Sequence, residues 1–373
     1  MRRLLLPLGL IAPFVARAAR GLPRALGAET ATLQRIAATS PHARDGRFVN
    51  TEPAAPLDRA AILPSVWGKI TAPGSPGRPP GPVPVVPGVP DGPAGALAVT
   101  WFGHASALLE IDGQRVLTDP MWSERASPSP VIGPRRMHPV PAVLERLPAL
   151  DVIVISHDHY DHLDVASVET LRDTTAAPFV VPLGIGAHLR SWGVPDARIT
   201  ELDWGGSTRV GDLTITCAEA RHFSGRGLAR DTTLWSSWVV AGPAHRVYFG
   251  GDTGYTAAFA RAGAELGPFD LTLLPVGAYS DLWPDIHMNP EEAVAAHRDL
   301  RGGMLVPIHW ATFDLGFHSW AEPVTRLVEA AAGDPGMPVR IAIPRPGQRI
   351  DVTAPDAAPS ANVGTDEWWN RLT

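Results

Sequence analysis

The sequence is almost free of cysteine. Among 373 residues there is one, Cys217, and an intramolecular disulfide framework is therefore excluded. It ends the apolar, strand-like run Leu213–Cys217, where a thiol is more often a small buried apolar group than a nucleophile or a metal ligand. One cysteine is compatible with either a reducing or an oxidising compartment.

An excess of positive charge is also lacking. The chain has 32 Lys and Arg against 38 Asp and Glu, which gives a formal net charge of −6 at pH 7. Nucleic-acid-binding domains carry a basic footprint, so we expect no nucleic-acid partner. The length and the 45% hydrophobic content are sufficient for a large core and one or two domains.

The apolar N-terminal run Leu4–Ala16 is too short to cross a bilayer as a helix, which takes about 20 residues. Its basic start and small residues near the end are typical of a secretory signal, although Pro7 and Pro13 interrupt it and Arg17 lies where cleavage would occur. Flanking arginines also suit an anchor on an anionic membrane surface, and a disordered arm is the third interpretation. We rank signal and anchor together above the arm, and expect a membrane-associated or exported protein rather than a freely cytoplasmic one.

Composition divides the chain into four parts: a signal-like or membrane-anchoring segment (residues 1–25), an N-terminal extension (26–94), a compact domain (95–352) and a C-terminal tail (353–373). Within the extension, residues 72–94 are dense in Pro and Gly. Because such a sequence supports neither a helix nor a central strand, it predicts a polyproline-like connector, which we interpret as a spacer. The tail is rich in Pro and Ala and predicted to be mobile, although Trp368 and Trp369 could dock it.

Short strand-like runs recur through residues 95–352. Asp112-Gly113 between two of them is a hairpin signal, and Ser319-Trp320-Ala321-Glu322 predicts a capping box that opens a helix ending near Gly333. The predicted strands are Leu97–Phe102, Ser106–Ile111, Arg115–Thr118, Val152–Ile155, Phe179–Val181, Leu213–Cys217, Trp238–Val240, Arg246–Phe249, Leu271–Pro275, Met304–Pro307, Arg340–Ile343 and Arg349–Val352. Strands mixed with helical stretches indicate an α/β fold.

The strongest chemical signal is Ser156-His157-Asp158-His159-Tyr160-Asp161-His162-Leu163-Asp164. It follows a short apolar run that predicts a buried strand, and Asp164 then caps a predicted helix. The motif therefore lies on a tight loop at the carboxyl end of a strand, where α/β folds place their chemistry. Isolated His and Asp residues on loops are usually solvated, but four potential ligands in HxHxDH order make that interpretation improbable.

Imidazole and carboxylate are ligands that zinc prefers. A loop this dense can hold two ions, with His157 and His159 on one and Asp161 and His162 on the other.

HxHxDH is the signature of the metallo-β-lactamase superfamily, and the chain resembles it beyond this motif. The resemblance narrows to the branch of N-acyl-phosphatidylethanolamine-hydrolysing phospholipase D and its bacterial relatives, over roughly residues 48–352. The motifs that carry it, besides residues 156–164, are Trp101-Phe102-Gly103-His104-Ala105, Leu117-Thr118-Asp119-Pro120, Gly133-Pro134-Arg135-Arg136, Gly251-Asp252-Thr253-Gly254-Tyr255 and Ile308-His309-Trp310-Ala311-Thr312-Phe313. It implies a four-layer αβ/βα sandwich, with residues 95–352 as the catalytic domain.

The resemblance also implies two Zn²⁺ per chain, although iron or manganese could replace zinc. The first ion would be held by His157, His159 and His222, and the second by Asp161, His162 and His309, with Asp252 bridging both. As catalytic residues it implies Asp161, Asp252 and His287, the last near the substrate phosphate. His287 comes just before a helix start predicted independently by Asn289 as N-cap, Pro290 at N1 and Glu292 at N3.

His104 and Asp119 are candidates for hydrogen-bond partners of the ligating imidazoles, and His104 could equally be a buried histidine bonded to the backbone. Three arginines of the loop 122–137 are candidates for phosphate recognition, because a guanidinium can donate two hydrogen bonds to one phosphate. Any one of them could equally be a surface residue on a loop: Arg125, Arg135 and Arg136. An apolar entrance could be lined by Trp310, Phe313, Phe317 and Trp320, although such residues are more often core.

The function expected from these residues is that of a zinc-dependent phosphodiesterase of the phospholipase D type. It would hydrolyse N-acyl-phosphatidylethanolamine-like lipids to phosphatidate and N-acylethanolamine. Its expected partners are a phospholipid substrate and a membrane surface, and a homodimer is a further possibility. The alternatives are a metal-dependent hydrolase of a lactone or a soluble phosphodiester, and a non-catalytic metal-binding protein of the same fold.

Overall fold

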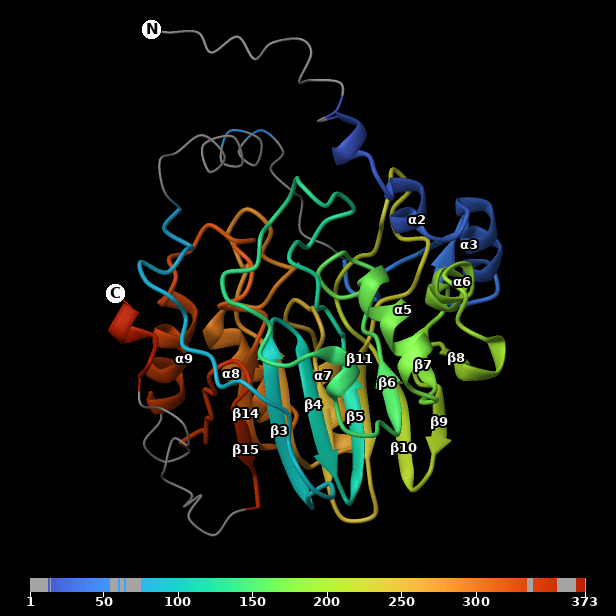
Figure 1. The fold of residues 1–373 in the computed structure, drawn as a ribbon. Helices are drawn as coiled ribbons and strands as arrows, with labels where there is room; N and C mark the ends of the chain where they lie inside the picture. The colour runs from blue at the N-terminus through green and yellow to red at the C-terminus, as the bar shows by residue number, and fades with distance from the viewer. Residues whose placement is uncertain are drawn as a thin grey trace, which may run out of the picture.

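Two β-sheets lie face to face at the centre of the computed structural model, with helices outside both (Figure 1). The structure describes residues 13, 15–53, 60, 64, 75–333, 338–353 and 367–372. Most of the N-terminal apolar run, and most of the tail, fall outside the described residues. None of the described helices has the length and apolar character needed to cross a membrane.

The first sheet has seven strands among the described residues and combines antiparallel with parallel pairing. Asp112-Gly113 turns the hairpin between its second and third strands in chain order, as predicted, and Asp112 has a positive φ of 49°. In spatial order the strands are β15 (Arg349–Asp351), β3 (Leu97–Gly103), β4 (Ser106–Ile111), β5 (Gln114–Thr118), β6 (Val152–Val154), β7 (Phe179–Pro182) and β8 (Ile199–Leu202).

The second sheet has six strands in the described part of the chain and is also mixed. Its spatial order is β14 (Gly302–Ile308), β13 (Phe269–Pro275), β12 (Arg246–Phe249), β11 (Ser237–Ala241), β10 (Leu213–Ala218) and β9 (Ser207–Val210). Alternate side chains of the two sheets, such as Val99 and Trp101 of β3 and Ile215 of β10, meet in one buried core, as expected for strands with a period of two.

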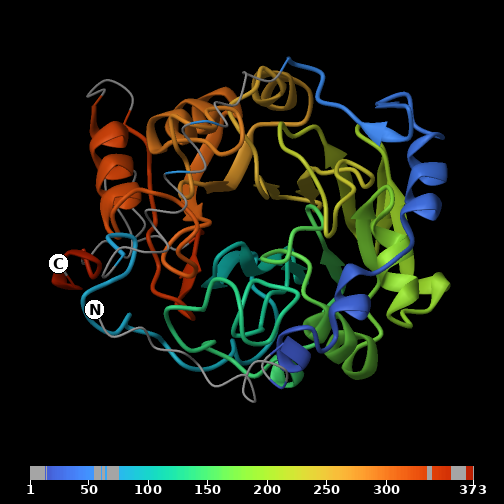
Figure 2. The ribbon, with the colours of Figure 1, turned by 90° about the horizontal axis from the view of Figure 1, so that it is seen from above.

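Helices complete the four layers. The outer face of the first sheet packs on α5 (Val165–Thr174) and α6 (Ile185–Ser191) through a separate apolar cluster. The second sheet is covered by α7 (Ala258–Glu265), α8 (Pro290–Asp299) and α9 (Glu322–Ala332). Figure 2, seen from above, shows the two helical layers on opposite sides of the strands. The predicted α/β four-layer sandwich is therefore confirmed.

Cap chemistry explains where two of these helices begin. The Asp164 side chain accepts from the Ser167 N–H, as predicted. The Asn289 side chain accepts from the Glu292 N–H, and the Glu292 carboxylate accepts in return from the Asn289 N–H, which completes a capping box. Both caps satisfy backbone donors that the first helical turn leaves without partners.

Three sequence expectations need correction. Helix α9 begins at Glu322, the last residue of the predicted box, rather than directly after Ser319. The Glu322 carboxylate accepts from the Ser319 N–H at 3.1 Å, but no side chain caps the helix. Residues 340–343 form only an isolated bridge, Leu305 with Ile341, rather than a strand. Strands β8 and β9 were not predicted, because both are polar and only half-buried and so lack an apolar pattern.

The N-terminal extension lies against the domain. It contributes α2 (Leu22–Leu26), α3 (Thr30–Ala37) and the hairpin of β1 (Ala43–Arg44) with β2 (Arg47–Phe48). The connector has no helix or strand over residues 75–94, as predicted, but Val83 is buried in the main core and the Val86 N–H donates to the Pro346 carbonyl. The described part of the connector is thus packed on the domain instead of acting as a free spacer.

Candidate metal centre

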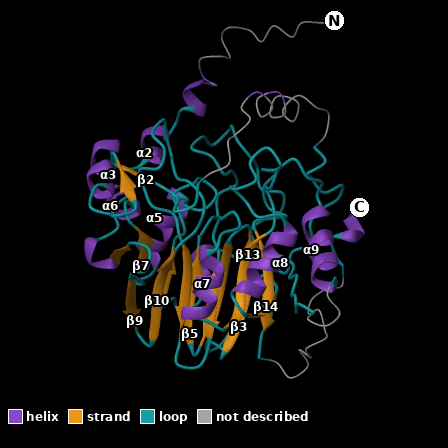
Figure 3. Ribbon diagram, turned by 180° about the vertical axis from the view of Figure 1, so that it is seen from behind, coloured by secondary structure: helices purple, strands orange, loops and turns teal. Residues whose placement is uncertain are grey.

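The strand ends bring the predicted ligands together. The HxHxDH loop follows β6, and the later candidates follow β10, β12 and β14. Figure 3 shows that the long loops gather at one end of both sheets. The converging side chains are buried or nearly so, although they come from segments far apart in sequence: His157, His159, Asp161, His162, His222, Asp252 and His309.

A first cluster consists of His157, His159, His222 and Asp252, each of which offers one atom within 4.8 Å of the others. The Nδ1 atom of His159 lies 2.8 Å from His157 Nε2 and 3.3 Å from His222 Nε2. Burial, followed by the charge of neighbouring histidines, lowers the pKa of His157 well below its usual value. A neutral imidazole keeps one nitrogen lone pair, and three imidazoles and a carboxylate that converge on one point offer a set of donor atoms that fits a metal ion.

The second cluster contains Asp161, His162 and His309, and the structure adds His104. The Asp161 Oδ2 atom lies 3.6 Å from His162 Nε2 and 3.5 Å from His309 Nε2. His104 Nε2 is 2.9 Å from the same oxygen. The buried His104 therefore bonds to a candidate ligand through its side chain, which the sequence left open.

Asp252 lies between the two clusters. Its Oδ2 atom is 3.1 Å from both His162 Nε2 and His309 Nε2, and 3.8 Å from both His157 Nε2 and His222 Nε2. Burial opposes ionisation of this carboxyl, but the facing His162 and His309 hold its pKa well below the usual range. One oxygen shared between two sets of imidazoles is the position expected of a bridging ligand.

Buried polar atoms without hydrogen-bond partners in the described residues concentrate here. They include His162 Nε2, His309 Nε2, Asp252 Oδ1 and His287 Nδ1. An unpaired buried polar group is costly, and several that converge on one point indicate a missing common partner. The donor set of imidazoles and carboxylates fits a divalent transition metal, and its two clusters fit a two-ion centre.

His287 lies at the edge of this centre. Its Nδ1 atom is 3.9 Å from Asp252 Oδ2, and its ring centre is 4.8 Å from that of His309. Burial, partly offset by the charge of Asp252, lowers the pKa of His287 to about 3. Its position before α8 is fixed by the Met288 N–H, which donates to the Thr253 carbonyl. A neutral imidazole is thus held beside the clusters.

Asp119 orients one ligand, as predicted. His162 Nδ1 lies 2.7 Å from Asp119 Oδ2, and the Ser156 N–H and hydroxyl also donate to this buried carboxylate at 2.6 and 2.5 Å. An Nδ1–H that donates to Asp119 leaves His162 Nε2 as the atom that faces the cluster and that can bind an ion once it has lost its proton. Such partners fix the tautomer and raise the basicity of a ligating imidazole.

Asn50 is a supporting residue that the sequence did not reveal. Its side-chain amide donates to the His222 carbonyl at 2.8 Å and accepts from the His222 N–H at 3.2 Å. The same oxygen accepts from the Trp235 indole at 3.1 Å. The N-terminal extension therefore fixes the backbone of a candidate ligand 172 residues further along the chain.

Arg226 is the second such residue. It is buried, and its Nη1 atom donates to the Asp158 and Leu163 carbonyls, both at 2.7 Å. These carbonyls flank the ligands of the HxHxDH loop, while Nε donates at 2.8 Å to the carbonyl of Ala25, the last residue of the N-terminal segment 1–25. One guanidinium thus joins the metal-binding loop to a distant segment of the chain.

The arginines expected to recognise phosphate have different surroundings. Arg125 is half-buried in a loop and donates to the Gly133 carbonyl, and Arg135 is exposed and paired with Glu124. Arg136 lies over the Phe313 ring, 5.1 Å from its centre. None of the three contacts the metal-ligand clusters in a described interaction.

Among the aromatic residues proposed for an entrance, two are core. Trp310 and Trp320 are buried and pack with Trp368, which confirms that the tail can dock through its tryptophans. Phe313 is also buried, 5.2 Å from the His104 ring, and the Phe317 ring is 5.1 Å from that of Trp283. Cys217 is buried as expected, and burial raises the pKa of its thiol.

Comparison with known proteins agrees with this fold and site. A family model for the β-lactamase superfamily domain matches residues 114–310, more than half of the chain. The chain therefore belongs to the metallo-β-lactamase superfamily, and its fold and His/Asp clusters define it as a metal-dependent hydrolase of that superfamily.

Individual relatives cover different shares of the chain. An uncharacterized protein of Mycobacterium tuberculosis is 57% identical over 358 residues, which are 95% of this chain and 94% of that protein. The N-acyl-phosphatidylethanolamine-hydrolyzing phospholipase D 1 of Caenorhabditis elegans is 40% identical over 62% of this chain and 69% of that protein. The structure of a metallo hydrolase from Ignicoccus hospitalis shares the fold, with a TM-score of 0.53 at 24% identity, over 68% of this chain and 97% of that one.

Proposed function

We propose that this protein is a zinc-dependent phosphodiesterase of the phospholipase D type, acting on N-acyl-phosphatidylethanolamine-like lipids. The observation that carries the proposal is the position of Asp252, one oxygen of which faces both histidine clusters. The 40% identity to the nematode N-acyl-phosphatidylethanolamine-hydrolyzing phospholipase D supports the substrate class. The products would be phosphatidate and N-acylethanolamine.

Each cluster would hold one zinc ion. His157, His159 and His222 would bind the first, Asp161, His162 and His309 the second, and Asp252 both. When bound, two such ions supply a hydroxide at neutral pH and neutralise charge on a phosphodiester. Asp161 would also receive the hydrogen bond of His104 on Oδ2, the oxygen that faces His162 and His309, and this bond orients the carboxylate.

His287 would hold a non-bridging oxygen of the substrate phosphate. Its Nδ1 atom is buried and has no hydrogen-bond partner in the described part of the chain. Because its pKa is lowered to about 3, the imidazole is neutral at pH 7 and keeps one N–H to donate. It would therefore orient the phosphate rather than contribute a full positive charge.

Residues 1–25 would bring the enzyme to its lipid substrate. We propose a membrane-associated or exported protein, because the sequence of this segment combines an apolar run with flanking arginines. A phospholipid and a membrane surface would then be its partners. Sedimentation with anionic vesicles, compared between the full chain and Arg2→Gln/Arg3→Gln, tests this part separately from catalysis.

The decisive experiment is hydrolysis of N-acyl-phosphatidylethanolamine in mixed micelles by the zinc-loaded protein. N-Acylethanolamine and phosphatidate should appear in equal amounts, and in ¹⁸O-labelled water the label should enter the phosphatidate phosphate, since attack is at phosphorus. Asp252→Asn should abolish turnover and leave the circular dichroism spectrum unchanged. Release of a fatty acid instead would contradict the reaction.

A soluble diester, bis-p-nitrophenyl phosphate, separates the chemistry from the substrate. Cleavage of the diester without the lipid would retain metal-dependent phosphodiester hydrolysis and exclude the lipid assignment. A protein that binds two zinc ions and cleaves neither substrate would exclude the proposed phosphodiesterase. Chelated protein and chelated protein with zinc restored are the matched controls.

A further inference from the structure

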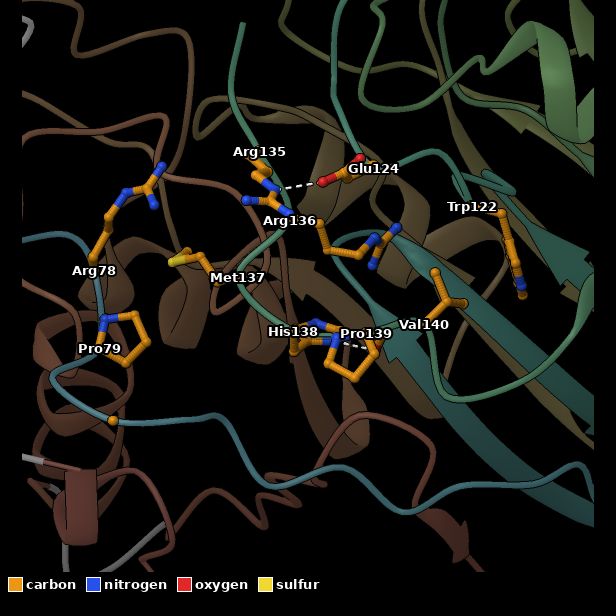
Figure 4. A pocket seen from close by; sticks show the side chains of 11 residues that line it. Arg78, Pro79, Trp122, Glu124, Arg135, Arg136, Met137, His138, Pro139 and Val140 are labelled. Atoms are coloured by element: carbon orange, nitrogen blue, oxygen red, sulfur yellow. Dashed lines mark hydrogen bonds and ion pairs between the residues drawn. The ribbon is translucent and has the colours of Figure 1, made fainter. Parts of the chain in front are cut away.

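Beside the metal centre lies a separate cavity of about 600 Å³. Its walls come from the connector at Arg78–Gly81, from the loop after β5 at Trp122 and Glu124, and from residues 135–140. Figure 4 shows Arg78 on the connector at one side and Arg135 with Arg136 on the other. None of the candidate metal ligands lines this cavity.

The lining has an excess of positive charge. Three guanidinium groups face one carboxylate, Glu124, and that carboxylate is paired with Arg135. Within the described residues, Arg78 has no ion-pair partner, and its side chain is exposed. The lining therefore carries about two positive charges more than its one carboxylate balances.

Arg136 provides a second and independent indication of a ligand. The side chain is half-buried, Nη2 donates to the Met121 carbonyl and Nε lies 3.5 Å from the Ser123 carbonyl. Its Nη1 atom is buried and has no hydrogen-bond acceptor in the described part of the chain. A guanidinium N–H without an acceptor is costly. Because Arg136 lines the cavity, a shift of its side chain toward an anionic oxygen bound there would give this N–H the acceptor that it lacks.

Apart from His138, the rest of the lining is apolar. Trp122, Met137 and Val140 contribute hydrocarbon surface beside the charged groups. An anion as small as phosphate would leave this apolar surface exposed to water. An amphiphile would cover the surface and place its own charged group among the arginines. Shape and charge together indicate a ligand with a phosphate head and an apolar body.

The cavity adjoins the candidate active site without being part of it. Arg136 lies 5.1 Å from the Phe313 ring centre, and that ring centre is 5.2 Å from the His104 ring. The Met137 N–H also donates to the Thr312 carbonyl at 2.9 Å. A ligand in the cavity would therefore sit one residue layer away from the metal clusters.

We propose that this cavity is a binding site for the phosphate head of an amphiphilic lipid, with Arg78, Arg135 and Arg136 as the anion-binding groups. The site concerns binding only, and it does not depend on which ester the metal centre hydrolyses. Its rim arginines hold the head, and Trp122 and Met137 contact the first carbons of the apolar part.

The test is calorimetric titration of the zinc-loaded full chain with dihexanoyl phosphatidate below its micelle concentration. The double variant Arg78→Gln/Arg135→Gln should weaken binding roughly tenfold or more, because two charge-assisted contacts are lost. Glu124→Gln should act in the opposite direction and strengthen binding, since it removes the one negative charge of the lining. Arg209→Gln, an exposed substitution on β9, is the matched control and should change nothing.

Other ligands and conditions give outcomes that can overturn the proposal. Equal affinity for inorganic phosphate, or for dihexanoyl phosphatidylcholine, would contradict a site for an anionic amphiphile. If binding persists in the double variant and disappears when the metal is chelated, the phosphatidate binds at the metal centre. That result would also overturn the proposal. These results are distinct from those of the hydrolysis assay, which the rim variants need not impair.

Discussion

The guanidinium carbon of Arg226 lies 4.2 Å from the centre of the Tyr160 ring, within the loop that carries the HxHxDH ligands. The Tyr160 hydroxyl donates in return to the Arg226 carbonyl at 2.5 Å. With the hydrogen bonds to the Asp158 and Leu163 carbonyls, this contact fixes the loop at both ends and in the middle. Arg226 therefore positions the metal-binding loop without itself touching a ligand atom.

We expect Arg226→Lys to weaken zinc binding by about 10- to 100-fold, the range found for groups that support metal ligands. Lysine keeps the charge but cannot make the forked contacts of a guanidinium. Competition with a zinc chelator measures the affinity, and the circular dichroism spectrum confirms folding. Arg209→Gln serves as the control, and unchanged zinc affinity in Arg226→Lys would show that the loop is rigid on its own.

The sequence predicted the ligands because they are local and repetitive. HxHxDH directly after a buried run places four potential ligands on one loop, and short apolar runs before His222, Asp252 and His309 place those residues at strand ends. The alternating core of the two sheets follows from the same runs. Local pattern was therefore sufficient for the α/β class and for the ligands of the HxHxDH loop, whereas the resemblance to the superfamily was needed for the four-layer sandwich and for the choice of His222, Asp252 and His309.

The supporting residues were not predictable in this way. Asn50 acts on a residue 172 positions later, and Arg226 on carbonyls 63 and 68 positions earlier. No periodicity encodes contacts at such separations. The same limit explains why β8 and β9 were missed, since both lie at sheet edges and lack an apolar pattern. It also explains the wrong start of α9, where Glu322 bonds to the Ser319 N–H but the helix begins three residues after Ser319.

Asp119 offers a test of ligand orientation. In Asp119→Asn, the new side-chain amide can turn either its N–H or its oxygen toward His162 Nδ1. In both cases the substitution removes the negative charge that raises the basicity of the imidazole. We expect zinc affinity at the second cluster to fall about 10- to 100-fold, and the first cluster to be less affected. Stoichiometric titration with cobalt, followed by its visible absorption, separates the two ions. Equal loss at both clusters would contradict a role confined to His162.

The C-terminal tryptophans give a stability prediction. Trp368 is 1% exposed, its indole donates to the Ile343 carbonyl, and its ring centre lies 5.3 Å from that of Trp310. We expect Trp368→Ala to lower the free energy of unfolding by about 3–5 kcal/mol, the cost of a large cavity. Denaturant titration at equal zinc content measures this. Ile132→Ala, at a side chain 52% exposed, should cost far less, and a similar small effect at Trp368 would show that the tail does not contribute to the core.

Zinc binding should release protons at neutral pH rather than take them up, and the protonation of two histidines determines this direction. Burial disfavours the charged form of His309, but the ionised Asp252 and Asp161 outweigh it and raise its pKa to about 9. His162 is buried as well, and the same carboxylates raise its pKa well above the usual value. Both imidazoles are thus protonated in the metal-free protein at pH 7, and both must lose the proton to bind zinc.

Full loading at pH 7 should therefore release about three protons, two from these imidazoles and about one from the water that becomes the bound hydroxide. The apparent zinc affinity should rise with pH until the pH exceeds the metal-free pKa values, about 9 for His309. Titration calorimetry in buffers of different ionisation enthalpy measures the number. His309→Gln should release one proton fewer, because Asp252 and Asp161 then raise the pKa of His162 alone. Loading that releases only the proton of the water, or none, would mean that these carboxylates do not hold the two imidazoles charged.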